Sequence, residues 1–174
     1  MRWRRRAAEA PANTDFAWKV HDNLGQGTGR ADTKASIALA IEIAVLGFII
    51  SLSDGEKNGP LANLQDWPLA FHVASIVVLC FSILMSLLTV IPQLRGRATH
   101  KEFRTNMIYF GHLRLWDPND LANALVDEIP ESQQLARQLV NMSKISWRKH
   151  IYLQWSLIAL VAAGIFLGAA LLWP

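Results

Sequence analysis

The chain has 174 residues, about the length of one domain, so a separate large soluble domain has little room. Its formal net charge is +3, and 52% of its residues are hydrophobic. The apolar residues are bunched in long runs, which excludes an ordinary soluble domain because such a domain places apolar residues at helix or strand periods.

The N-terminal segment, residues 1–34, is predicted to be a cytoplasmic segment rich in basic residues. Its glycine-rich piece, residues 25–29 (GQGTG), follows no predicted strand and lacks both the Walker and the dinucleotide spacing. We therefore interpret it as a flexible hinge rather than a phosphate loop. The polar cluster Ala31–Ser36 follows, where we expect Asp32 and Lys34 to cap the helix and reach the membrane surface.

Three apolar runs, residues 35–53, 69–91 and 151–173, are predicted to be transmembrane helices, with an outer loop over residues 54–68. At about 1.5 Å per residue each run can cover a hydrocarbon core near 30 Å, the first only just. The runs have helical length and lack the alternation of a barrel strand. The sequence therefore predicts an all-α integral membrane protein with three transmembrane helices.

Glu42 is the one unambiguous charge inside a predicted span. A carboxylate in lipid is strongly unfavourable. We therefore expect Glu42 to face a protein interior, a water-filled path or a protonated partner, and a path through an oligomer is one functional reading of this residue.

The basic residues lie almost entirely on one predicted side of the membrane. Seven Lys and Arg residues precede or begin the first span, one lies between the first two spans, and nine lie between the second and third. This bias predicts a multi-pass membrane protein with its N-terminus and residues 92–150 in the cytoplasm. Attraction to anionic lipid accounts for the basic residues, so we expect no nucleic acid partner.

Residues 92–150 are predicted to form a small helical cytoplasmic region. Within it, Ile108–Leu113 is short, apolar and aromatic, and we interpret it as a strand or an extended segment. Asp117 is predicted to cap a helix that has Pro118 at its first position. After Pro130 an amphipathic stretch is expected to continue without a break into the third span.

The sequence contains no assembled catalytic group, because it has no Ser/His/Asp arrangement, no paired metal ligands and no suitable carboxylate pair. We therefore expect no catalytic residue, no metal site, no cofactor and no enzymatic activity. Two alternatives stay open. The chain could be a structural membrane adaptor that recruits a soluble partner, or a lipid-modifying enzyme that depends on His112 or Asp117.

Three pieces of the sequence carry a resemblance to a known family: Ala31–Ser36 before the first span, the aromatic segment Tyr109–Leu113, and Gln138–Lys149 (QLVNMSKISWRK) before the last span. In their order and spacing the chain, from about Phe16 onward, resembles the transmembrane-type effectors of Pycsar antiphage defence (PycTM). The resemblance implies that a neighbouring pyrimidine cyclase makes cyclic CMP or cyclic UMP upon infection. The effector then impairs the inner membrane by pore formation or bilayer damage, in an abortive infection.

The chain departs from other cyclic-nucleotide receptors in having no recognisable nucleotide-binding β-roll. A directly bound nucleotide would therefore contact the cytoplasmic helices and the segment before the first span, and binding between copies would favour a homo-oligomer in the lipid membrane. Basic groups would meet the phosphate, and an aromatic ring, Trp116 included, would stack on the base. The candidate ligand-binding residues are Arg30, Asp32, Lys34, Arg104, Tyr109, Phe110, His112 and Arg114.

Overall fold

The computed structural model describes residues 14–53, 61, 64–92, 103–105, 107–126 and 131–172. These ranges contain α2 (Thr14–Leu52), α3 (Asp66–Val90), the 3₁₀ turn η2 (Phe103–Thr105), α5 (Phe110–Leu113), α6 (Pro118–Val126) and α7 (Glu131–Leu172). No strand occurs within them, and α2, α3 and α7 are each long and apolar enough to cross a membrane. The predicted all-α class with three membrane-crossing helices is confirmed.

The chain divides into two compact units. The first unit comprises Met1–Gly27 and Gln93–Ser146, and the second unit comprises Thr28–Pro92 and Trp147–Pro174. The second unit therefore contains the apolar parts of all three long helices. The prediction that the stretch after Pro130 continues into the third span is also confirmed, because α7 is one helix of 42 residues.

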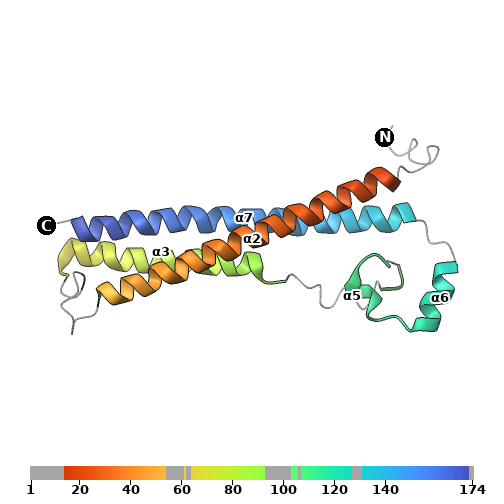
Figure 1. Cartoon of the computed structure of the whole chain (residues 1–174), viewed down its shortest axis with the longest axis horizontal. Helices are drawn as coiled ribbons and strands as arrows, with labels where there is room; N and C mark the ends of the chain where they lie inside the picture. The colour runs from red at the N-terminus through yellow and green to blue at the C-terminus, as the bar shows by residue number, and fades with distance from the viewer. Residues whose placement is uncertain are drawn as a thin grey trace. The chain divides into compact units, whose positions relative to one another are not determined.

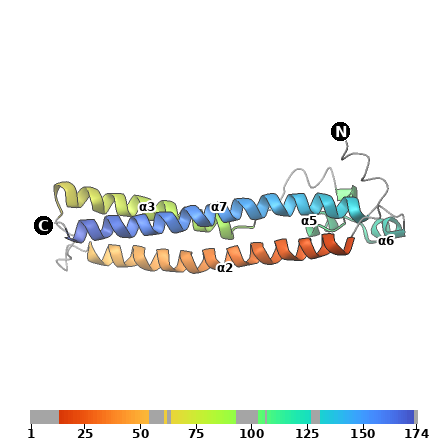
Figure 2. The ribbon, with the colours of Figure 1, turned by 90° about the horizontal axis from the view of Figure 1, so that it is seen from above.

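The three helices of the second unit lie side by side (Figure 1, Figure 2). On α2 the buried residues Ala31, Ala35 and Ala38 recur at spacings of four and three residues. Residues at this spacing share one helix face, and alanines there let neighbouring backbones approach closely, as in other membrane bundles. On α7, Ala159 and Ala163 are buried in the same way.

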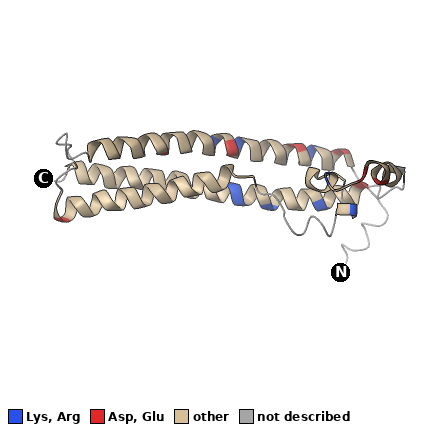
Figure 3. Ribbon diagram, turned by 90° about the horizontal axis from the view of Figure 1, so that it is seen from below, with Lys and Arg blue, Asp and Glu red and all other residues tan. Residues whose placement is uncertain are grey.

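Apolar packing in the second unit centres on Ile49, Leu79 and Ala163, one residue from each long helix. Large apolar side chains also point outward, among them Phe48 and Ile165, each more than half exposed. Figure 3 shows few charged residues on the parts of α2, α3 and α7 that belong to the second unit. An apolar exterior is the arrangement that lipid favours, since bilayer helices place their polar residues inside.

In the first unit, hydrogen bonds tie the start of α2, and the backbone between η2 and α5, to α7. The Trp18 Nε1–H donates to Glu131 Oε1 at 2.7 Å, and the backbone N–H of Met107 donates to Gln134 Oε1 at 2.9 Å. The predicted cap of α6 is confirmed, because the backbone N–H of Asn119 donates to Asp117 Oδ1 at 2.9 Å.

Two sequence interpretations of local structure are wrong. The segment Ile108–Leu113 is neither strand nor extended throughout, because Phe110–Leu113 forms the short helix α5. Residues 25–29 do not form an irregular hinge, because they are helical within α2 and none of the glycines has a positive φ. Hydrogen bonding along α2 evidently outweighs the weak helix propensity of the three glycines there.

Candidate functional site

A buried carboxylate joins the three long helices of the second unit. Glu42 of α2 is fully buried, and its Oε1 accepts hydrogen bonds from three serine hydroxyls: Ser82 at 2.5 Å and Ser86 at 3.1 Å from α3, and Ser156 at 2.9 Å from α7. We expected Glu42 to face a protein interior, a water-filled path or a protonated partner, and in the structure it faces the protein interior. An intramolecular hydrogen bond contributes about 0.5–1.5 kcal/mol net, so the three bonds of this cluster together fasten α2 to both neighbours.

The serines of this cluster also contact each other and the backbone. The Ser82 hydroxyl lies 2.7 Å from the carbonyl oxygen of Ser156, and the Ser86 and Ser156 hydroxyl oxygens lie 2.7 Å apart. The second carboxylate oxygen of Glu42, Oε2, is buried and has no hydrogen-bond partner among the described residues. The carboxylate is therefore held firmly on one side and left unsatisfied on the other.

The rest of the buried face of α3 is also largely polar. Six residues of α3 are buried, and Leu79 is the single apolar one among them. We call the five others the polar seam: His72, Ser75, Ser82, Ser86 and Thr89.

The seam is bonded along its length. The Ser75 hydroxyl donates to the carbonyl oxygen of Ala163 at 2.9 Å, and the Thr89 hydroxyl donates to the carbonyl oxygen of Met85 at 3.0 Å. His72 Nε2 lies 3.2 Å from the Ser53 hydroxyl, whereas its buried Nδ1 has no partner among the described residues. The side chains of the polar seam therefore face protein and not lipid.

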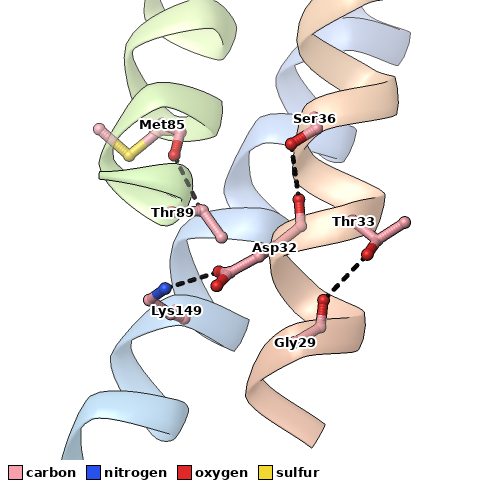
Figure 4. A network of polar contacts seen from close by, with 7 residues as sticks. All are labelled: Gly29, Asp32, Thr33, Ser36, Met85, Thr89 and Lys149. Atoms are coloured by element: carbon pink, nitrogen blue, oxygen red, sulfur yellow. Dashed lines mark hydrogen bonds and ion pairs between the residues drawn. The ribbon is translucent and has the colours of Figure 1, made fainter. Parts of the chain in front are cut away.

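The first group of predicted ligand residues, Arg30, Asp32 and Lys34, lies on α2 in the second unit. The Asp32 Oδ1 forms an ion pair with the Nζ of Lys149 at 2.6 Å, next to Thr89 (Figure 4). Lys149 is almost completely buried, whereas Arg30 and Lys34 are exposed. Asp32 therefore has a structural partner on α7. The sequence-based expectation that Asp32 and Lys34 cap the helix and reach the membrane surface did not include this partner.

Short-range hydrogen bonds hold the polar cluster of α2 in a regular helix. The Thr33 hydroxyl donates to the carbonyl oxygen of Gly29 at 3.1 Å, and the Ser36 hydroxyl donates to that of Asp32 at 2.9 Å (Figure 4). Bonds of this kind use the carbonyl four residues earlier and so satisfy a hydroxyl without a second helix. The hydroxyls of this cluster need no partner outside α2.

The second group of predicted ligand residues lies on η2, on α5 and just beside them in the first unit. Tyr109 contacts two of its neighbours, with ring centroids 4.8 Å from Phe110 and 5.2 Å from His112. His112 is buried, while Phe110 and Arg114 are exposed. The structure thus brings these four side chains to one turn of chain and leaves a cation and an aromatic ring accessible.

Arg104 is the remaining member of the second group. Its guanidinium lies 3.5 Å from the Asp120 carboxylate and 5.7 Å from the centre of the Phe103 ring. Both charged side chains are more than half exposed, so this ion pair is weak and a stronger anion could replace the carboxylate. Trp116 donates its indole N–H to the carbonyl oxygen of Phe103 at 3.1 Å, which ties it to η2.

Sequence reasoning did not single out four residues with clear structural roles: Lys149, Ser82, Ser86 and Ser156. The serines were hidden because their apolar neighbours dominate any average hydropathy, although Ser75, Ser82 and Ser86 do recur on one helix face. Within the described ranges no three His, Cys, Asp or Glu residues gather in a way that could hold a metal ion.

Comparison with known proteins identifies one family. The family model described as PycTM, the Pycsar effector protein domain, matches residues 16–173. No curated protein sequence and no solved structure gives a significant match to the chain. The match covers almost the whole chain and includes both groups of candidate residues as well as the Glu42 cluster.

Proposed function

Because this chain belongs to the Pycsar effector family, it is an effector of cyclic-nucleotide-signalled antiphage defence, and we propose that cyclic CMP or cyclic UMP activates it to impair the inner membrane. The family match carries the defence role. The three helices long enough to cross a bilayer support the membrane as the place where the effector acts. The infected cell would then stop growing before phage mature.

The nucleotide in this proposal comes from a cyclase encoded nearby and binds the first unit directly. A cyclic nucleotide offers one negative phosphate and a flat base. Arg104 and Arg114 supply exposed cations for the phosphate, and exposed Phe110 supplies a ring for the base. The chemistry required by the ligand is therefore present on one short stretch of chain.

Binding can be tested on the full chain in detergent by calorimetry with cyclic UMP and with cyclic CMP. Arg114→Ala should weaken binding about 10- to 100-fold, the effect of losing one charge-assisted hydrogen bond, and Phe110→Ala should weaken it by a similar factor. Arg137→Ala removes an exposed arginine on α7 and serves as the control. Equal affinities for all variants would contradict this site.

Orientation follows from the distribution of basic residues. We place the N-terminus and residues 92–150 in the cytoplasm, because 16 of the 17 Lys and Arg residues then lie on the cytoplasmic side. This places the candidate nucleotide residues where a cytoplasmic cyclase releases its product. A reporter active only in the periplasm, fused after Pro174, should be active, and a reporter active only in the cytoplasm should be silent there.

Membrane impairment requires several copies of the chain. Three helices do not enclose a wide aqueous path, so the proposal includes a homo-oligomer whose spans regroup upon activation. The nucleotide can drive this change only through unequal affinity for the resting and active states, and a thousandfold shift requires about 4 kcal/mol of preference. The proposed activity is binding and permeation without catalysis.

The decisive experiment uses proteoliposomes that contain the full chain and a trapped dye or ion indicator. Cyclic UMP or cyclic CMP should trigger release, whereas cyclic AMP should not. Phe110→Ala vesicles are the matched control, because the spans are unchanged in this variant. Absence of release from a preparation that binds the nucleotide would refute membrane impairment and would favour an adaptor role.

A further inference from the structure

The polar seam of α3 reaches across most of the thickness of a bilayer. It runs from His72 to Thr89, which corresponds to about 26 Å along a helix and compares with a hydrocarbon core of about 30 Å. A helix that only anchors a protein has no need for a polar face of this length. The four hydroxyl groups of the seam, from Ser75 to Thr89, are distributed over about 21 Å of the helix, with the buried Leu79 between Ser75 and Ser82.

Two buried atoms of the second unit, one on α2 and one on the seam of α3, lack a hydrogen-bond partner within the described ranges. They are Oε2 of Glu42, a fully buried residue, and Nδ1 of His72, which is 8% exposed. A buried polar atom without a partner is unfavourable, and contact with water or a cation would relieve it. Water or a cation that reached these two atoms in another state of the protein would satisfy them.

The charged residues of the three spans determine whether the polar seam would favour a cation or an anion. No Lys or Arg lies in residues 35–53, 69–91 or 151–173, and Glu42 is the one acidic residue in these ranges. Hydroxyl oxygens and a carboxylate are groups that replace water around Na⁺ and K⁺. An anion would find a repelling carboxylate here, and the ammonium that lies beside the seam, that of Lys149 next to Thr89, is already paired with Asp32.

We propose that the polar seam and Glu42 line a path for monovalent cations that opens when the nucleotide activates the effector. This inference rests on the proposed function and makes it more specific, because it names the permeating species and the residues that line its path. In the described state the path is closed. The Ser82 hydroxyl shares its one proton between Glu42 Oε1 and the carbonyl oxygen of Ser156, and the Ser75 hydroxyl donates to the carbonyl oxygen of Ala163.

The same hydrogen bonds explain how the bundle can open. When α3 separates from α2 and α7, each serine hydroxyl exchanges a protein acceptor for water, and the difference in free energy is about 0.5–1.5 kcal/mol for each bond. An apolar seam would instead resist wetting, which is how hydrophobic constrictions close channels. A polar seam thus lets several copies of the chain enclose a hydrated path between them.

Selectivity is the first test. The full chain is placed in a planar bilayer under a KCl gradient and activated with cyclic UMP or with cyclic CMP. In the wild type K⁺ should permeate about tenfold faster than Cl⁻, and Glu42→Gln should bring this ratio near one. Asp66→Asn removes an exposed carboxylate at the start of α3 and should keep the wild-type ratio. An unchanged ratio in Glu42→Gln would overturn the inference.

Accessibility is the second test and does not depend on the folding of Glu42→Gln. Cys80 is first replaced by alanine, and Ser82→Cys is then compared with Leu84→Cys, which lies on the outward side of the same helix and is half exposed. A membrane-impermeant cationic thiol reagent should block the current of Ser82→Cys once nucleotide is added. It should leave Leu84→Cys unaffected.

The outcomes separate the inference from the function on which it rests. If the wild type passes no current with either nucleotide, membrane permeation itself fails. If the wild type conducts and Leu84→Cys is blocked while Ser82→Cys is not, the protein permeates the membrane by another surface. The path along the seam is then refuted.

Discussion

The ion pair between α2 and α7 allows a quantitative prediction. Lys149 is 5% exposed and its Nζ lies 2.6 Å from Asp32 Oδ1, whereas the Asp32 side chain is 37% exposed. Asp32→Asn leaves the lysine charge buried beside a neutral amide. Removing one partner of a fully buried pair costs about 3–5 kcal/mol. Because solvent reaches Asp32, we expect a smaller loss, about 2–3 kcal/mol of unfolding free energy.

The two halves of this ion pair are predicted to behave differently. Lys149→Met leaves a carboxylate that water can still solvate, so its loss should be smaller than that of Asp32→Asn. The double variant, which replaces the pair by an amide and an apolar side chain, should recover part of the loss. A double-mutant cycle then gives the coupling energy between the two residues.

The assay is equilibrium unfolding of the purified protein in mixed detergent micelles, followed by far-UV circular dichroism. Asp22→Asn is the matched control, because Asp22 lies on the same helix with its side chain 72% exposed, and it should change stability by less than about 0.5 kcal/mol. If Asp32→Asn were as stable as this control, the ion pair would not hold α2 to α7 and the reasoning from burial would fail.

Three further predictions concern the described helices, each measured as thermal stability in detergent. Gly111→Ala should destabilise by about 1–3 kcal/mol, because the new Cβ would overlap the Tyr109 ring; an unchanged melting temperature would contradict this contact. Gly27→Ala should stabilise α2 by about 0.5–1 kcal/mol, because its Cβ meets no atom within 4 Å and alanine favours the helix; a loss would contradict the helical assignment. Trp18→Phe should lower the stability by about 0.5–1.5 kcal/mol, because it removes the hydrogen bond to Glu131. Adding Glu131→Ala to Trp18→Phe should cause no further loss, because that bond is already absent.

The membrane-crossing helices could be predicted from the sequence because their signal is long and one-dimensional. An apolar run near 20 residues has few alternatives to a helix in lipid, whatever it packs against. The cap of α6 was equally predictable, since Asp117 and Pro118 act on their immediate neighbours. Features that depend on nearby residues or on length alone are the ones that the sequence conveys.

The two local errors have a common cause. Tyr109 and Phe110 favour strands as residue types, but the Tyr109 ring contacts both Phe110 and His112, and those contacts fit a turn of helix. Residues 25–29 contain three glycines, which alone indicate flexibility, but they lie inside a helix of 39 residues. In both places the wider structure overrides the intrinsic preference of a short segment.

The candidate site was predictable only in part. The position of Glu42 in an apolar run indicated that it needs a special environment, but nothing in one sequence tells which of many serines supplies it. Lys149 was counted among the basic residues that mark the cytoplasmic side, and its burial against Asp32 depends on how α7 packs on α2. Partners that are more than a hundred residues apart are visible only in the folded chain.

The polar seam indicates a different way to read membrane sequences of this kind. In a soluble helix the apolar stripe marks the buried face, whereas in α3 the outward residues Val73, Val77 and Leu84 are apolar and the buried ones are mostly polar. Lipid removes any reason to bury apolar side chains, so the informative pattern is the spacing of the few polar residues. The same hydroxyls that bind Glu42 in the resting bundle would bind water in the open bundle. A single set of side chains can therefore stabilise both states, and the nucleotide needs only to choose between them.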